Sequence, residues 1–216
     1  MKNEKHMIRV LLADDHNIFR QGLKEIIENT PDIKVAAEAS TGRQAIKEAL
    51  SENCDVVMLD LTLPDIHGID VLKQIKQACP EKAVIVLTMH PEEQYGLRAL
   101  RSGAAGYLTK ECEAEELISA VRKAHTGGVY ITPCFAEHIA GNSSGNKGIL
   151  PHEILSDREF QLLCMIAAGK RIKDIAENLS LSPKTVSTYR NRLLQKLNLK
   201  TNEQLTTYAI NHKLLD

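Results

Sequence analysis

Five polar residues in the first half of the chain follow or end short apolar runs, and their types suit phosphoryl transfer. Asp14 and Asp15 follow the first such run and Asp60 follows the third, whereas Thr88 ends the fourth and Lys110 follows the fifth. Carboxylates, a hydroxyl and an ammonium group are the side chains that bind a divalent cation and a transferred phosphoryl group. Whether these residues act together depends on the elements that position them.

The first 125 residues alternate short apolar runs with longer amphipathic segments, which predicts five strand–helix repeats around a parallel sheet. The run Val84–Leu87 is apolar on both faces, as a buried parallel strand requires. We therefore expect an α/β fold, a doubly wound (βα)5 sheet. The predicted strands are 8–13, 33–38, 55–59, 83–88 and 105–108, and the predicted helices are 17–29, 42–51, 67–78, 92–101 and 113–124.

This fold brings the five polar residues to one edge, because loops at the carboxyl ends of parallel strands converge on one crevice. Asp14, Asp15 and Asp60 would repel one another there unless a cation neutralised them, and an all-oxygen site suits Mg²⁺ or Mn²⁺. With such a cation bound, Asp60 can act as a carboxylate nucleophile, while Lys110 and the Thr88 hydroxyl bind phosphoryl oxygens. The pattern thus predicts a phosphoryl-acceptor site.

The second half of the chain has no strand pattern. Periodicity fades over 126–152, and the run Gly141–Gly148 has the composition of a flexible linker. The predicted organisation is a first domain over 1–125, a linker over 126–152 and a helical domain over 153–216. Helices are expected over 156–168, 171–178, 183–197 and 202–212.

The helix predicted over 183–197 follows a shorter helix and a tight turn, which is the spacing of a helix-turn-helix. Its Val186, Leu193, Leu194 and Leu197 share one face and should pack inward. The opposite face is polar, with basic residues for phosphates and hydroxyl or amide groups for base edges. The candidate DNA-contacting residues are Lys184, Thr185, Ser187, Thr188, Arg190, Asn191, Arg192 and Lys196.

Composition narrows the class of protein. Hydrophobic residues make up 43% and charged residues 25% of the 216 residues, which excludes disorder, collagen and coiled coil. The net charge of −1 divides into −4 over residues 1–125 (16 basic, 20 acidic) and +3 over 150–216 (10 basic, 7 acidic). Five scattered cysteines without a C-x-x-C pair, and no signal peptide or membrane span, predict a cytoplasmic location.

Residues 7–125 resemble the receiver domain of two-component response regulators. The residues that carry the likeness are Asp14-Asp15, the run Leu59–Gly68, Thr88 and the run Gly103–Lys110. The resemblance implies that Asp60 accepts phosphate from a sensor histidine kinase. It also implies that Asp15, Asp60 and the Thr62 carbonyl hold the metal directly, with Asp14 acting through water.

The same resemblance assigns a switch pair. Thr88 and Tyr107 match the hydroxyl that moves towards the phosphoryl group and the aromatic ring that turns inward, which couples the site to the fourth helix and fifth strand. His90, two residues after Thr88, lies where the family tunes the lifetime of the phosphate.

The helical domain resembles the LuxR type, on the residues Leu155-Ser156-x-Arg158-Glu159, Gly169-Lys170 through Asp174-Ile175-Ala176, and Leu181–Val186 through Lys196-Leu197. Together the two likenesses make the chain similar to the NarL/FixJ response regulators. They imply a transcription regulator, not an enzyme, that binds promoter DNA at symmetric half-sites as a homodimer at least when phosphorylated, with no membrane partner.

Two alternatives stay open. A Mg²⁺-dependent phosphatase on a similar sheet also uses an aspartate nucleophile, but such enzymes carry a second aspartate two residues later, where this chain has Thr62. The helical domain could instead recognise a protein. Binding to DNA phosphates weakens steeply with salt, which separates that alternative from DNA binding.

Overall fold

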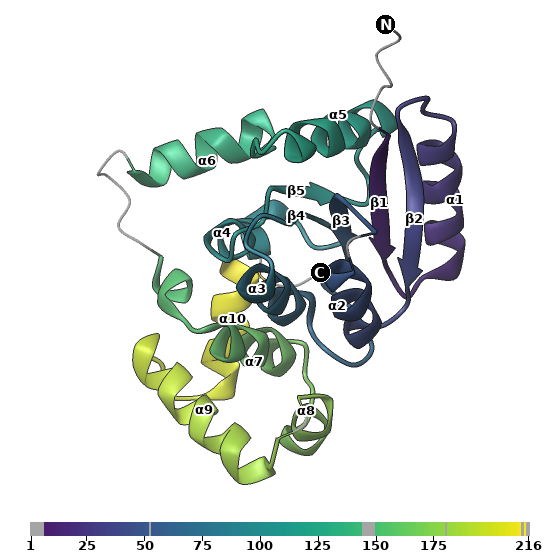
Figure 1. Cartoon of the computed structure of the whole chain (residues 1–216). Helices are drawn as coiled ribbons and strands as arrows, with labels where there is room; N and C mark the ends of the chain where they lie inside the picture. Colours follow the sequence, from purple (N-terminus) through teal and green to yellow (C-terminus); the bar gives the residue numbers. More distant parts are fainter. Residues whose placement is uncertain (1–6, 52, 144–149, 180, 213, 215–216) are drawn as a thin grey trace, which may run out of the picture. The chain divides into compact units, whose positions relative to one another are not determined.

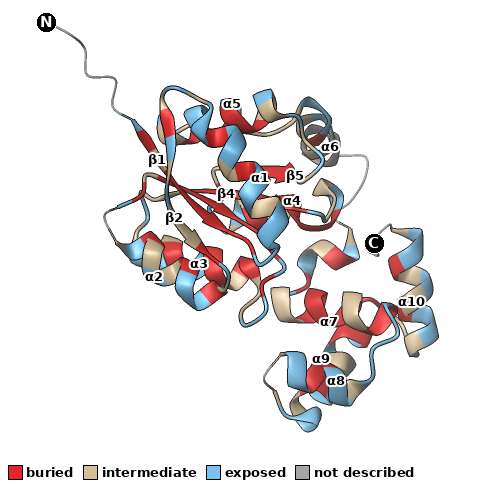
Figure 2. Ribbon diagram, turned by 90° about the vertical axis from the view of Figure 1, so that its right-hand side faces the viewer, coloured by how far each residue is buried: buried red, intermediate tan, exposed pale blue. Residues whose placement is uncertain are grey.

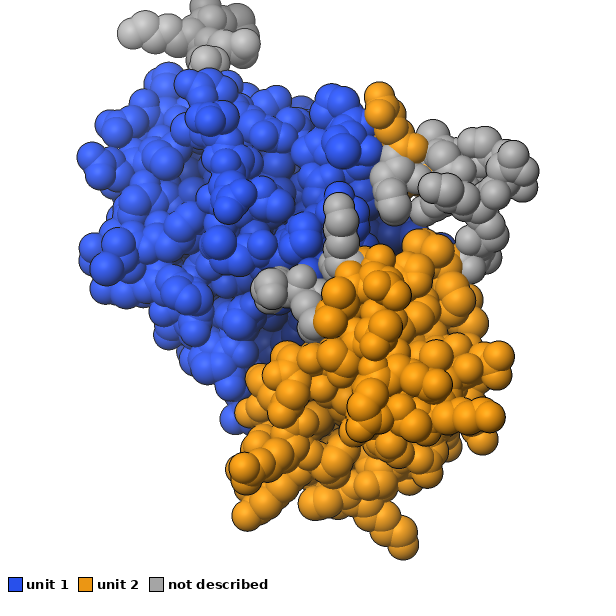
Figure 3. Space-filling view, turned by 180° about the vertical axis from the view of Figure 1, so that it is seen from behind, with its two compact units in different colours: residues 1–136 blue, residues 137–216 orange. Residues whose placement is uncertain are grey.

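The computed structural model describes residues 7–51, 53–143, 150–179, 181–212 and 214. The chain divides into two compact units, residues 1–136 and 137–216, which Figure 3 colours separately. Each unit has its own core. In the described part of the chain, no helix is both long and apolar enough to cross a membrane.

The first unit contains a five-stranded parallel sheet with strand order β2-β1-β3-β4-β5, which confirms the α/β expectation (Figure 1). Its three central strands are almost entirely buried, whereas edge strand β2 is buried only at its two ends and is half-buried or exposed between them (Figure 2). The strands are β1 (Ile8–Ala13), β2 (Ile33–Ala39), β3 (Val56–Leu59), β4 (Ala83–Thr88) and β5 (Gly106–Thr109).

Helices cover both faces of the sheet (Figure 1). Leu23 and Ile27 of α1 and Val121 of α5 share one core cluster with Val10 and Met58, so α1 and α5 cover the same face. The other face is covered by α2, α3 and α4, which contact one another in sequence. The helices are α1 (Asn17–Glu28), α2 (Gly42–Leu50), α3 (Gly68–Ala78), α4 (Glu92–Arg101) and α5 (Ala114–His125).

The loop between β3 and α3 folds tightly back on the end of β3. A Cβ added to Gly68 would lie 2.4 Å from the Asp60 carbonyl oxygen and 2.5 Å from the Leu61 Cα, so only glycine fits there. In the same loop, the Asp65 carboxylate accepts hydrogen bonds from the backbone N–H groups of Gly42 and Arg43 and so caps α2. These contacts fix the backbone that follows Asp60.

Part of the segment predicted as a linker is ordered. Helix α6 (Pro133–Ser143) lies inside 126–152, and a 3₁₀ helix (Pro151–Ile154) closes that segment. The Thr132 hydroxyl accepts a hydrogen bond from the Phe135 N–H, and proline at the helix start is favourable, so α6 is specified by its cap. The sequence of α6 has no amphipathic stripe, so the pattern of apolar residues did not predict this helix. Of the predicted flexible run, residues 144–148 lie outside the described residues.

The start of α6 packs on the first unit. Phe135 is 2% exposed, and its ring lies so close to α4 that a Cβ on Gly96 would be 2.5 Å from it. The Thr132 hydroxyl donates to Glu92 at the start of α4, at 2.8 Å. Tyr130 pairs with Gly106 as an extra bridge beside β5. Residues 130–136 are therefore anchored against α4 and β5.

The second unit is all helical, with α7 (Asp157–Ala167), α8 (Ile172–Asn178), α9 (Pro183–Lys196) and α10 (Asn202–Asn211). Helix α7 contacts both α9 and α10, and α8 contacts α9. Phe160, Ile175, Leu193 and Leu205, one from each helix, are fully buried in this core. The predicted capping box is present, because Ser156 and Glu159 bond each other's backbone at the start of α7.

Filling the notch at Gly96 should displace Phe135. Gly96→Ala is expected to destabilise the first unit by about 1–3 kcal/mol, because the added methyl group has no room. Hydrogen exchange at residues 132–136 should then accelerate. Gly22→Ala, in the interior of α1 with open space around its Cβ position, is the matched control and should stabilise by about 0.5–1 kcal/mol. Equal protection of residues 132–136 in both variants would contradict the packing described here.

Candidate functional site

A buried ammonium group joins two carboxylates at the carboxyl edge of the sheet. The Lys110 Nζ lies 2.7 Å from Asp14 Oδ2 and 2.7 Å from Asp60 Oδ2. Asp14 follows β1, Asp60 follows β3 and Lys110 follows β5, so three loops from separate strands meet at one point. All three side chains are at most 6% exposed. This geometry agrees with the crevice expected from the sheet topology.

The environment of Lys110 keeps it charged. Burial alone would lower its pKa, but the hydrogen bonds and charges of Asp14 and Asp60 outweigh that effect and raise the pKa. The Lys110 Nζ also lies 4.7 Å from the centre of the Phe19 ring, which favours the cationic form further. A positive charge is therefore fixed beside Asp60.

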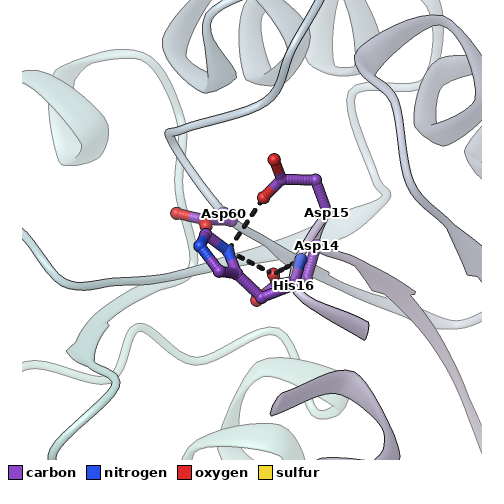
Figure 4. A group of neighbouring side chains, drawn as sticks. All are labelled: Asp14, Asp15, His16 and Asp60. Atoms are coloured by element: carbon purple, nitrogen blue, oxygen red, sulfur yellow. Dashed lines mark hydrogen bonds and ion pairs between the residues drawn. The ribbon is translucent and has the colours of Figure 1, made fainter. Parts of the chain in front are cut away.

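Asp15 and His16 complete the edge of the site (Figure 4). The His16 Nδ1 lies 2.8 Å from Asp15 Oδ1 and 3.3 Å from Asp14 Oδ1. The His16 backbone N–H donates to Asp14 Oδ1 at 2.8 Å, which fixes the turn that leads into α1. Potential ligand atoms of Asp14, Asp15, His16 and Asp60 all lie within 4.8 Å of one another.

The second oxygen of Asp60 is held by the loop that follows it. The Thr62 N–H donates to Asp60 Oδ1 at 3.1 Å. The Thr62 hydroxyl lies 3.3 Å from His90 Nε2, so the loops after β3 and β4 are also linked. Both Asp60 oxygens are thus oriented, one by a backbone amide and one by Lys110.

Thr88 and Tyr107 lie beside the site but in different environments. The Thr88 carbonyl accepts the Lys110 N–H at 2.8 Å, while its buried hydroxyl has no hydrogen-bond partner among the described residues. A buried hydroxyl without a partner costs about 1–3 kcal/mol of stability. A hydrogen bond from the Thr88 hydroxyl to an incoming acceptor would remove this cost. The Tyr107 ring is fully buried, and its hydroxyl donates to the His90 carbonyl at 2.9 Å.

The residues present fit a divalent cation. Three carboxylates against the one ammonium of Lys110 leave two negative charges at the edge of the sheet. Lys110 engages one oxygen each of Asp14 and Asp60, whereas Asp15 is 35% exposed and faces only His16 in the described interactions. Oxygen donors of this number and charge are those that Mg²⁺ and Mn²⁺ prefer.

In the second unit, helix α9 carries a hollow of about 310 Å³ lined by five residues. They are Lys184, Thr185, Thr188, Tyr189 and Arg192. Ser182 caps the helix by accepting the Thr185 N–H at 3.1 Å, which fixes the turn that presents its first residues. The four predicted inward residues of α9 and its end are all buried. The helix therefore presents a polar face with two basic residues.

Two basic residues of α9 are committed to contacts within the unit. The Lys196 Nζ lies 2.7 Å from Glu159 Oε2 on α7. The Arg190 Nε donates to Asn202 Oδ1 at the start of α10, at 2.6 Å. Both contacts hold α9 against its neighbours.

Comparison with known proteins identifies both units. Residues 10–122 match the family described as "Response regulator receiver domain", and residues 153–209 match "Bacterial regulatory proteins, luxR family". Response regulator UvrY of Escherichia coli is 39% identical over 209 residues, covering 96% of each chain. Response regulator GacA of Pseudomonas aeruginosa is 34% identical over 211 residues, covering 97% of this chain and 99% of GacA.

The chain belongs to the NarL/FixJ family of response regulators. It is a two-component response regulator with a receiver and a LuxR-type DNA-binding domain. Among solved structures, RcsB of Salmonella enterica serovar Typhimurium, bound to promoter rprA with the phosphomimetic BeF3⁻, matches with a TM-score of 0.70 at 25% identity. The match covers 94% of this chain and 98% of RcsB.

For this NarL/FixJ regulator, the structure brings together Asp14, Asp60 and Lys110 directly, and Asp15 through His16. Sequence reasoning missed His16 as a member of the site, although it directly follows the aspartate pair. It also missed Tyr189, which lies four residues after Thr185 and three residues before Arg192 and so shares their helical face. That spacing was readable in the sequence.

Glu159 should make the stability of the second unit depend on pH. Its side chain is 4% exposed. Burial alone would raise its pKa, but bonds from Lys196 and Ser156 outweigh this and lower the pKa. The ionised form is thus favoured by folding, so its contribution is present above the ordinary value of about 4.3 and is lost as the pH falls below it.

Glu159→Gln should therefore cost about 1–2 kcal/mol at neutral pH. The difference from wild type should shrink in chemical denaturation at about pH 3, below the ordinary pKa of about 4.3, because the ionised form then stabilises the folded state less. Glu177→Gln, which changes an exposed acid on α8, should have no effect at either pH. A difference for Glu159→Gln that is independent of pH would refute this assignment.

Proposed function

We propose that this regulator accepts a phosphoryl group on Asp60 from a sensor histidine kinase, and that phosphorylation promotes dimerisation and promoter binding. The observation that carries the proposal is the position of Asp60, with one oxygen 2.7 Å from the charged Lys110 and the other held by the Thr62 N–H. This carboxylate is oriented, nearly buried and beside a fixed positive charge, as a phosphoryl acceptor needs.

In the proposed transfer, a carboxylate oxygen of Asp60 attacks the phosphorus of a phosphohistidine. The new O–P bond forms as the P–N bond breaks, and the bonding pair returns to the imidazole of the kinase. Lys110 would pair with a phosphoryl oxygen, and the Thr88 hydroxyl would donate to another. A divalent cation held by Asp15, Asp60 and the Thr62 carbonyl, with Asp14 through water, would offset charge on the phosphoryl oxygens.

Intact mass after incubation with acetyl phosphate and Mg²⁺ tests the acceptor. The wild type should gain one phosphoryl group, and Asp60→Asn none, because the amide is not a nucleophile. Chelation of the metal should abolish the gain. Equal labelling of Asp60→Asn would refute the assignment, and continuous release of phosphate over many turnovers would favour a phosphatase instead.

Helix α9 supplies the DNA-contacting face in this proposal. Lys184 and Arg192 line its hollow and would contact phosphates, while Ser187, Thr188 and Asn191 would read base edges. We further propose that Arg190 and Lys196 contribute by positioning α9, because both are bonded within the unit. RcsB, a structural relative, binds promoter DNA with a phosphomimetic present.

Dimerisation would join two copies of α9 across symmetric half-sites. Helix α10 exposes 59% of Ile210, an apolar side chain that a second copy can cover. Paired recognition helices add affinity, so a shift towards the dimer on phosphorylation would raise promoter occupancy without a change in the helix itself.

DNA binding by α9 should show the salt dependence of phosphate contacts. Lys184→Ala and Arg192→Ala should each weaken binding to promoter and random duplex and lower the slope of log affinity against log salt by about 1. Lys200→Ala, an exposed basic residue of the same unit outside the hollow, is the matched control. If the wild type shows no salt-dependent binding to duplex DNA, recognition of a protein is favoured instead.

A further inference from the structure

His16 stands at the start of α1 but does not act as its cap. It is the residue before the first turn, yet its side chain makes no capping hydrogen bond to the helix. The imidazole turns instead towards the carboxylates of Asp14 and Asp15, as Figure 4 shows. The His16 imidazole is therefore free of the helix and lies against the carboxylates of the site.

We propose that His16 is a nitrogen ligand of the divalent cation bound by the aspartates, and that it shifts the preference of this site from Mg²⁺ towards first-row transition ions. This inference rests on the proposed function in one respect only, that both use the same aspartate carboxylates. It concerns which cation loads the receiver.

The spacing of donor atoms supports coordination by His16. Adjacent ligands of a six-coordinate ion, each about 2.1 Å from it, lie about 3 Å apart. The His16 Nδ1 lies 2.8 Å from Oδ1 of the direct ligand Asp15, close to that value. The imidazole is 61% exposed, so it can turn to share an ion without disturbing the core.

The chemistry of the donor set determines the preference. Asp14, Asp15 and Asp60 alone form an all-oxygen site, which suits Mg²⁺. An imidazole adds a softer donor without adding negative charge, and this favours Mn²⁺, Co²⁺, Ni²⁺ or Zn²⁺ over Mg²⁺.

The test uses the full-length protein stripped of metal, without phosphodonor. Pulsed EPR of the Mn²⁺-loaded wild type should show modulation from a directly bound nitrogen, and His16→Asn should lose it. In calorimetric titrations, the ratio of Co²⁺ to Mg²⁺ affinity should fall at least about tenfold in His16→Asn, because a ligand to Co²⁺ is lost. His90→Asn removes an imidazole at the same sheet edge but outside the four-residue group, and should retain the nitrogen signal.

Two results would overturn the inference: no nitrogen modulation in the wild type, or an unchanged affinity ratio in His16→Asn. Either would mean that the imidazole only hydrogen-bonds to the carboxylates. Phosphoryl uptake from acetyl phosphate with Mg²⁺, measured by mass on the same preparations, separates this from failure of the proposed function. If uptake is absent while the nitrogen signal depends on His16, the acceptor proposal fails and the ligand assignment stands.

Discussion

The pairing of one buried ammonium with two buried carboxylates is the interaction on which the first unit depends. Lys110 reaches both Asp14 and Asp60 only because β1, β3 and β5 end at the same edge of one parallel sheet. Removing one partner from such a group leaves an uncompensated buried charge, which is strongly destabilising. The sheet topology therefore brings these charges together, and the charges in turn hold the three loops at fixed positions.

The same edge is connected through α4 to the segment that leaves the receiver. The Tyr107 hydroxyl bonds to the His90 carbonyl in the loop that leads into α4, and Glu92 in the first turn of α4 accepts from Thr132. Three residues later Phe135 occupies the notch in α4. Each contact lies within the first unit. A displacement of α4 would thus act directly on the start of α6, which continues past the boundary between the units.

The elements that could be predicted from the sequence are those whose apolar residues recur with the period of a strand or a helix. Strands β1 and β4 begin and end where the apolar runs do, and the polar residues that follow them mark the site, because parallel topology leaves one place for them. Among the described side chains of helix α6, Phe135 is the buried apolar one. The helix is specified by its cap and by a notch in α4 that exists only after folding. The orientation of the His16 ring likewise depends on the folded site, since the ring contacts Asp14 and Asp15 and makes no bond to the helix that it precedes.

The second unit shows why residue type alone does not assign a DNA contact. Arg190 and Lys196 have the charge that phosphates attract, yet each is bonded to a neighbouring helix. The Glu159 that binds Lys196 also completes the cap of α7, so one carboxylate orients both the first helix and the end of α9. Lys184 and Arg192, without such bonds in the described interactions, remain available on the open face. Helix α9 therefore carries two classes of cation, those bonded to neighbouring helices and those on its open face.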